Sequence, residues 1–590
     1  METSRGKRKR SAPKDQEAVN PTELEDILID ILDKDIDKED IDDSDHDPDY
    51  LEGSDHATDT NQSDSENNDL TANTSTSSAS NGNLVGGDIP TDDGNNLQRG
   101  RNLFYFGRRT KEMIKKNVSG FKWKKEFPNQ AVRTRRENIV TQLPGLKAHA
   151  SNLGDNPEVI DVWKLLFTQD IIDEILLWTN KKIASIRPRY KNPTSFIHDA
   201  DYIELYGFIG LLIYSAVFKS GNESVDSIFA TDGTGRELFR CTMSKERFLF
   251  LLHALRFDNP DDRDDRKKDV KEASISNIFY KFIENSQLCY TVGTSCCVDE
   301  MLVPFRSRCS FKMYLPNKPA KYGLKIQCLT DAKTNYLYSA YLYTGKGSDG
   351  RGLTDQDQKL LKPTQAVIRL TESIEGTNRN ITADNWYSSI ELVEELRRRG
   401  MTYVGTLKKN KTEIPVSFQP NRCREENEAL YGYTENMTLL SYVPKKSKAV
   451  ILVSSMHHGP GTDETINKPE IIAEYNRTKG GVDTVDQMCS NYSTQRRSRR
   501  WPMAIFFALL NISAGVNAFV LYKAYKNTPD MNRLEFMKVL AKSLVSPLLQ
   551  KRLDRGHHVT EEMKLAIKRI LQIQDPLPVP DNKKSFSKIN

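Results

Sequence analysis

The sequence predicts an α/β protein with a helical region before and after a strand-rich centre, preceded by a disordered acidic tail. Three observations support this: a polar, acidic start, apolar residues at helical spacing over residues 119–294, and short apolar runs typical of strands from residue 295 onward. Of the 590 residues, 37% are hydrophobic, which is enough for a sizeable core in part of the chain.

Residues 1–118 are expected to be disordered, because Ser, Asn, Asp, Gly and Thr dominate and offer little apolar surface. The first 100 residues carry 26 acids against 9 basic residues, a net charge of −17, and the remaining 490 carry a net +21. The net positive charge of residues 101–590 indicates a nucleic-acid partner, although many large proteins are mildly basic. Ser63 and Ser65 lie among acids and are candidate kinase sites. A basic cluster at the start predicts nuclear import, with a solvated charge run as the alternative: Lys7, Arg8, Lys9 and Arg10.

Residues 119–294 are expected to be helical, because apolar residues recur three and four apart over 160–183, 202–221 and 243–257. The charged stretch 261–271 is expected to be a loop. Residues 501–522 are long and apolar enough to span a membrane. Asn511, Ser513 and Asn517 interrupt this stretch, so we expect a buried core helix and no membrane.

The centre of the chain is expected to hold an α/β core in two parts, residues 295–410 and 471–492. Ala332 to Asn335 is a good hairpin turn between two strand-like runs. Residues 411–470 alternate short strands with turns and are interpreted as an inserted β-rich domain. Helices are expected again over 493–572, followed by an unstructured tail over 573–590.

Four acids stand where strands and helices of this core are expected. Asp299 lies within an apolar strand, and Asp384 ends another. Asp483 and Asp486 are three apart, which places both on one face if their segment is helical. Converging carboxylates favour hard divalent cations, Mg²⁺ or Mn²⁺, and two such ions suit in-line phosphoryl displacement. The alternative is that each acid is a turn or cap residue.

Basic residues with interleaved aromatics flank these acids and are candidate DNA-binding positions, with ordinary solvated surface as the alternative. They are Arg306, Arg308, Lys312, Lys318, Lys321, Lys408, Lys411, Arg496, Arg497, Arg499, Arg500 and Trp501. The eight cysteines include no CxxC pair, which suits a reducing compartment and gives no support for a zinc module.

Four blocks of the sequence resemble the successive signature blocks of piggyBac transposases, in the same order: residues 298–326, 380–411, 475–488 and 499–512. The resemblance implies a ribonuclease-H-like core with a three-aspartate metal site at Asp299, Asp384 and Asp483, and Asp486 as a further acid close by. It also implies a helical dimerisation and DNA-binding domain over 119–294 and 493–572, with 411–470 as the insertion domain.

The resemblance further implies a cut-and-paste DNA transposase that acts in the nucleus as a homodimer on double-stranded transposon ends. Such an enzyme nicks the end, forms and opens a hairpin, and joins the end to a TTAA target. The alternative is a host-adopted descendant that binds DNA without transposing. Members of the family commonly end in a cysteine-rich zinc module. Here the last cysteine is Cys489, so this lineage lacks the module or the chain is truncated.

Overall fold

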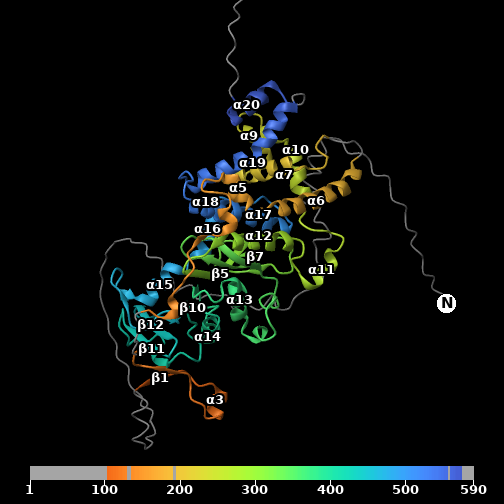
Figure 1. The fold of residues 1–590 in the computed structure, drawn as a ribbon. Coiled ribbons are helices and arrows are strands. Elements are labelled where there is room, and N and C mark those ends of the chain that lie inside the picture. The colour runs from red at the N-terminus through yellow and green to blue at the C-terminus, as the bar shows by residue number, and fades with distance from the viewer. Residues whose placement is uncertain (1–102, 129–133, 191–194, 556–558, 574–590) are drawn as a thin grey trace, which may run out of the picture.

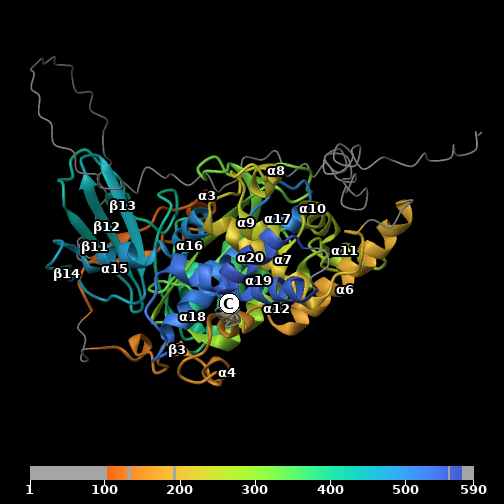
Figure 2. The ribbon, with the colours of Figure 1, turned by 90° about the horizontal axis from the view of Figure 1, so that it is seen from above.

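The computed structural model describes residues 103–128, 134–190, 195–555 and 559–573 (Figure 1). The import cluster predicted at 7–10 and the candidate kinase sites Ser63 and Ser65 lie outside the described residues. The fold is mixed α/β, as predicted: one 11-stranded sheet has helices on both faces, and a thick helical layer covers one of them (Figures 1 and 2).

One half of the sheet has the strand order β8-β7-β5-β9-β10. Strands β5 (Ser295–Pro304), β7 (Tyr322–Asp331) and β8 (Leu337–Leu342) are antiparallel, and the expected hairpin turn joins the last two. Strands β9 (Asn380–Ala383) and β10 (Thr402–Thr406) run parallel to β5, with α14 (Ile390–Arg398) between them. Apolar runs that are buried on both faces explain why this part of the sequence predicted strands.

The sheet continues beyond β10 through β13 (Lys448–Ser454), β12 (Thr438–Lys445) and β11 (Ala429–Tyr433). The β-rich stretch 411–470 therefore adds its strands to the same sheet, next to β10. Two short strands near the start of the chain, β2 (Lys122–Lys124) and β1 (Phe104–Phe106), complete this end.

The prediction that disorder extends to residue 118 is therefore wrong for its last part. Residues 104–118 form β1 and a short helix, α3 (Lys111–Lys115). Trp123 of β2 is fully buried, and its indole N–H donates to the Glu413 carbonyl at 2.9 Å. The partners that order this segment lie some three hundred residues away, so local composition could not reveal them.

Helices cover the two faces of the sheet unequally. Helices α13 (Lys362–Thr371) and α14 lie on one face, while α12 (Ser276–Cys289), α16 (Gly481–Asn491) and α17 (Trp501–Ile512) lie on the other (Figure 1). Beyond the second group, α7 (Tyr202–Val217) packs closely on α19 (Arg533–Arg555). A Cβ added at Gly207 would stand 2.6 Å from Leu548 Cδ2, so glycine permits this approach.

The apolar stretch of the C-terminal part is a core helix, as expected. Among the described residues, Trp501–Ala524 is the one helix apolar and long enough to cross a membrane, and 94% of its most apolar 18 residues are buried. Its polar residues bind neighbouring elements. Asn517 accepts from Leu337 N at 2.9 Å and donates to Leu337 O at 2.8 Å, and Asn511 accepts from Thr494 N at 2.8 Å. These satisfied amides suit a protein interior.

The prediction of a loop over 261–271 is wrong in part. Residues Arg263–Asp269 form helix α11. Two charge pairs stabilise this turn: Arg266 with Asp262 at 2.8 Å, and Arg263 with the buried Asp258 at 2.8 Å. Because the stretch is rich in charged residues, its composition suggests a loop and does not show these local pairs.

Candidate active site

Asp299 lies in the middle of β5, the middle strand of the order β8-β7-β5-β9-β10. Its Oδ1 accepts a hydrogen bond from the Glu300 backbone N–H at 2.8 Å, and the side chain is half-buried. On one side β7 pairs antiparallel with β5, with Cys328 opposite Asp299. On the other side the partner is the parallel strand β9.

Asp384 is the first residue after β9. The register pairs Val298 with Ala383, so the next residues on the two strands, Asp299 and Asp384, are direct neighbours. Adjacent strands are about 4.8 Å apart, and residues in matching register point to the same face. The Asp384 carboxylate accepts from Trp386 N at 2.8 Å, which fixes its orientation.

Helix α16 brings the third acid close to Asp299. The helix packs across β5 and β7, and a Cβ added at Gly481 would stand 2.5 Å from Thr330 Oγ1 and 3.0 Å from Cys297 Cβ. Glycine therefore allows the first turn of α16, which carries Asp483, to touch the sheet. The segment is helical as predicted, with Asp483 exposed and Asp486, one turn further, half-buried.

Lys318 lies among these acids. Its ammonium group donates to Asp483 Oδ1 at 3.1 Å and to the Glu300 carbonyl at 2.9 Å, and it is 3.9 Å from Glu300 Oε1. The sequence predicts Lys318 to be a DNA-binding residue. The structure instead places it in direct contact with the acids.

The electrostatics of the site combine burial with mutual repulsion among its carboxylates. Burial, together with the charges of Glu300 and Asp384, holds the pKa of Asp299 well above its usual range. Burial and the charge of Glu300 raise the pKa of Asp384 to about 6. Burial would lower the pKa of Lys318, but Asp299, Glu300 and Asp483 together raise it. The site therefore favours added positive charge.

The donor set fits a hard divalent cation. The three aspartates offer only carboxylate oxygens, which Mg²⁺ and Mn²⁺ prefer. Within the described parts of the chain, no three His, Cys, Asp or Glu side chains already stand in metal-ligand geometry. Asp483 pairs with Lys318, while Asp299 and Asp384 repel each other, and a cation between these two would relieve that repulsion.

Two residues of the site were missed by sequence reasoning. Glu300 is 9% exposed and influences the pKa of both Asp299 and Asp384. Lys325 of β7 is fully buried, with its ammonium 4.7 Å from the centre of the Trp386 ring. A signal for each was present: a second acid directly after Asp299, and a lysine inside an otherwise apolar strand.

The predicted basic residues after β5 divide by environment. Arg306, Arg308 and Lys321 are exposed. Lys312 is half-buried and donates to the carbonyls of Arg306 and Ser307 at 3.1 and 3.0 Å, so it stabilises the turn that presents them. Further along the chain, the half-buried Lys408 and Lys411 follow the end of β10.

The arginine-rich linker between α16 and α17 alternates between buried and exposed positions. Arg496 is buried and donates to the Ser220 and Glu223 carbonyls at 2.8 and 3.1 Å. Arg500 is also buried and donates to the Leu255 carbonyl at 2.7 Å. These two residues attach the linker to the helical layer, a role that differs from the predicted contact with DNA.

Trp501 is likewise buried, and its ring meets that of Phe311 edge-on at 5.0 Å. With 5% of its surface exposed, Trp501 has little area for its predicted contact with DNA. Arg497 and Arg499 are the exposed members of the linker.

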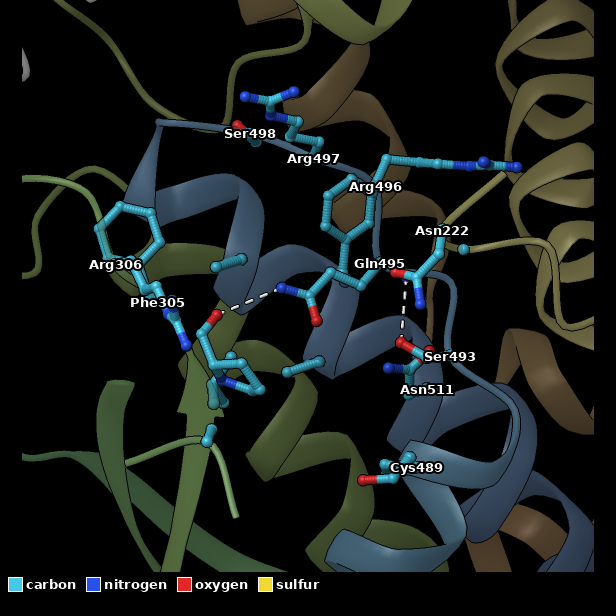
Figure 3. Close-up of a pocket in the computed structure, with 18 of the residues that line it drawn as sticks. Asn222, Phe305, Arg306, Cys489, Ser493, Gln495, Arg496, Arg497, Ser498 and Asn511 are labelled. Atoms are coloured by element: carbon cyan, nitrogen blue, oxygen red, sulfur yellow. Dashed lines mark hydrogen bonds between the residues drawn. The ribbon is translucent and has the colours of Figure 1, made fainter. Parts of the chain in front are cut away.

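A cavity of 1320 Å³ is lined by Arg306, Arg497 and Arg499, and Asp486 lines it as well (Figure 3). In Figure 3, Arg306 and Arg497 lie on two sides of it, and Gln495 donates to the Pro304 carbonyl at 3.2 Å. This bond ties the linker to the end of β5. The cavity therefore brings exposed cations from two distant parts of the chain next to the acidic site.

Comparison with known proteins defines the class of the chain. Residues 160–519 match the family model described as Transposase IS4, which spans more than half of the chain. The protein is thus of the transposase class. A solved chain titled as a cryo-EM structure of a piggyBac transposase synaptic complex with hairpin DNA is 34% identical, with a TM-score of 0.68 over 75% of this chain and 90% of that one. The chain belongs to the piggyBac family of transposases.

Two curated human relatives are more distant. PiggyBac transposable element-derived protein 2 is 24% identical over 57% of this chain and 58% of its own length. PiggyBac transposable element-derived protein 3 is 21% identical over 41% of this chain and 42% of its own length. The chain thus spans little more than half of the first relative and less than half of the second.

Proposed function

We propose that the chain is a metal-dependent DNA transposase that cleaves and joins strands by phosphoryl transfer. The observation that carries this is the register of β5 and β9, which makes Asp299 and Asp384 neighbours below the first turn of α16 with Asp483. The strand order β8-β7-β5-β9-β10, three antiparallel strands followed by two parallel ones, supports a ribonuclease-H-like core.

In this proposal Asp299, Asp384 and Asp483 hold two Mg²⁺ or Mn²⁺ ions, with Asp486 as a nearby acid. Bound ions would polarise the attacking and leaving oxygens of an in-line displacement. The backbone amide of Trp386 keeps the Asp384 carboxylate in place, which reduces the cost of organising the site. Lys318 holds Asp483 and neutralises part of the acidic charge, so that a DNA phosphate can approach.

The exposed cations around the cavity are proposed to hold the DNA backbone. Arg306, Arg497 and Arg499 line the cavity, and Arg308 lies two residues beyond Arg306. Their exposed guanidinium groups can bind phosphate oxygens in pairs. Lys408 and Lys411 lie at the same edge of the sheet, beyond β10. In this arrangement the acids act on a DNA strand that these cations hold on both sides of the acidic site.

The finer features of the activity follow from the family. We propose nicking of the transposon end, hairpin formation and opening, and joining at TTAA, carried out by a homodimer in the nucleus. Residues 411–470 would serve as the insertion domain, and the helices over 119–294 and 493–572 as the dimerisation and DNA-binding domain. A kinase acting on the acidic tail is a further proposed partner.

The proposal is tested with the full chain and a plasmid that carries this element's own flanking repeats between TTAA sites. We expect breaks at the repeat boundaries with Mg²⁺ or Mn²⁺, and none with a chelator. Breaks that persist in chelator would remove the metal from the account. Breaks scattered without regard to the repeats would reduce the protein to a general nuclease.

The second candidate is a host-adopted protein that binds DNA without transposing it. The observation that favours it is the naming of both curated relatives as transposable element-derived proteins. The retained acids and their register favour catalysis over this alternative. Binding of DNA with no cleavage in any divalent metal would support the adopted protein.

A further inference from the structure

A second strongly basic surface lies outside the residues considered so far. Residues 108–125 contain eight Lys and Arg against a single acid, Glu112. They span α3 and β2, at the end of the sheet farthest from β8 (Figure 1). Besides Arg108 and Arg109, six exposed lysines make up this basic N-terminal segment: Lys111, Lys115, Lys116, Lys122, Lys124 and Lys125.

The basic N-terminal segment is held firmly against the sheet. Trp123 is buried between its exposed lysine neighbours and donates to the Glu413 carbonyl. Gly107 and Gly120 approach so closely that a Cβ on Gly120 would stand 2.1 Å from the Gly107 carbonyl oxygen. Thr110 caps α3 by accepting from Met113 N at 3.2 Å. The lysines therefore project from a defined backbone.

The segment is attached to the loop that follows β10. Arg108 Nη2 donates to the Lys411 carbonyl at 3.0 Å and to the Lys409 carbonyl at 3.3 Å. Gly107 and Arg108 also pair with the loop through a bridge to Pro415 and a backbone bond to Thr412 O at 2.6 Å. The exposed lysines are thus continuous with the loop that carries Lys408 and Lys411.

The same loop connects the segment to the acidic site. Strands β9 and β10 run parallel, with Ala383 opposite Gly405, so Asp384, the first residue after β9, lies beside Thr406, the last residue of β10. Lys408 follows two residues after Thr406. Basic residues therefore continue from the ends of β9 and β10, where Asp384 lies, through this loop to α3 and β2.

We propose that the basic N-terminal segment binds the backbone of duplex DNA that extends away from the acidic site. Lysine ammonium groups are point charges that hold phosphate without reading sequence. Eight cations with one acid, anchored to a loop at the edge of the acidic site, suit a rod of uniform negative charge. The inference rests on the proposed function, because it assumes that the acids act on DNA.

The test compares two charge-neutralised variants of the full chain, Lys111→Gln/Lys115→Gln/Lys116→Gln and Lys122→Gln/Lys124→Gln/Lys125→Gln. Binding to a long mixed-sequence duplex is measured across a salt series. Each phosphate contact contributes about 0.9 to the slope of log affinity against log salt, so loss of three contacts lowers the slope by about 2.7. The matched control is Lys267→Gln/Lys268→Gln/Lys271→Gln, which neutralises three lysines at the other side of the sheet.

We expect weaker binding and a shallower slope in either N-terminal triple variant, with melting temperatures like those of the unchanged chain. Slopes equal to that of the control triple, or tighter binding, would overturn the inference. Metal-dependent cleavage by the unchanged chain is assayed in parallel. Cleavage with unaltered slopes would refute this surface alone. Altered slopes without any cleavage would support the surface and count against the proposed catalytic function.

Discussion

Asp384 stands beside Asp299 because it is the first residue after β9, one step beyond the pairing of Ala383 with Val298. Replacing Asp299, Asp384 or Asp483 by alanine is expected to reduce DNA cleavage to background, because each change removes one carboxylate of the proposed metal site. DNA binding should remain, since the exposed cations are untouched. Cleavage assays and mobility shifts on the same preparations check both. Cleavage that survives one of these changes would exclude that aspartate from the site.

The raised pKa of Asp384 predicts a pH-dependent stability in metal-free buffer. Its pKa is about 6 in the folded protein against an ordinary value of 3.8, so its contribution to stability is full below pH 3.8 and is lost as the pH rises through 6. Asp384→Asn should remove this loss and be more stable than the unchanged chain at pH 7, by on the order of 3 kcal/mol.

Chemical unfolding at pH 4 and pH 7 measures this difference. Added Mg²⁺ or Mn²⁺ should raise the melting temperature of the unchanged chain more than that of Asp384→Asn. Identical pH profiles for the two proteins, or equal responses to metal, would contradict the electrostatic account of the site.

Gly481 and Gly480 provide a matched pair for the position of α16. A Cβ at Gly481 would meet Thr330 Oγ1 and Cys297 Cβ, whereas a Cβ at Gly480 would meet nothing within 4 Å. Gly481→Ala should therefore displace Asp483, lower the free energy of unfolding by about 1–3 kcal/mol and impair cleavage. Gly480→Ala should leave cleavage near normal. Equal effects in the two variants would show that the contact does not set the position of the helix.

Arg496 and Arg497 are neighbours in sequence with opposite environments. Arg496→Ala leaves buried carbonyls without a donor and should lower the free energy of unfolding by about 2–3 kcal/mol. Arg497→Ala should change stability by less than about 0.5 kcal/mol and reduce the salt slope of DNA binding by about 1. Unfolding and binding titrations separate the two, and a reversed pattern would contradict the assignment of roles.

Much of the fold could be predicted because its signals are local. The strands around Asp299 and Asp384, the helix of Asp483 and the core helix that begins at Trp501 each carry their pattern in adjacent residues. Strands β1 and β2 could not be predicted, because they are held in place by contacts with Glu413 and other residues far along the chain. Helix α11 was missed because its charges suggested a loop.

The site was predictable in residue type but not in arrangement. The acids attract attention because a carboxylate in an apolar strand needs compensation. Composition alone does not show that Lys318 contacts Asp483, or that the arginines of the linker alternate between carbonyl partners and solvent. Those facts depend on which distant elements meet at the end of β5.

The most direct test of the central claim is a plasmid excision assay in cells, with a donor that carries this element's own flanking repeats between TTAA sites. The unchanged chain is compared with Asp384→Ala at equal protein levels. The account predicts precise restoration of a single TTAA with the unchanged chain and none with the variant. Equal excision by both proteins would contradict the role of Asp384, and no excision by either, with the protein bound to DNA, would favour the adopted DNA-binding protein.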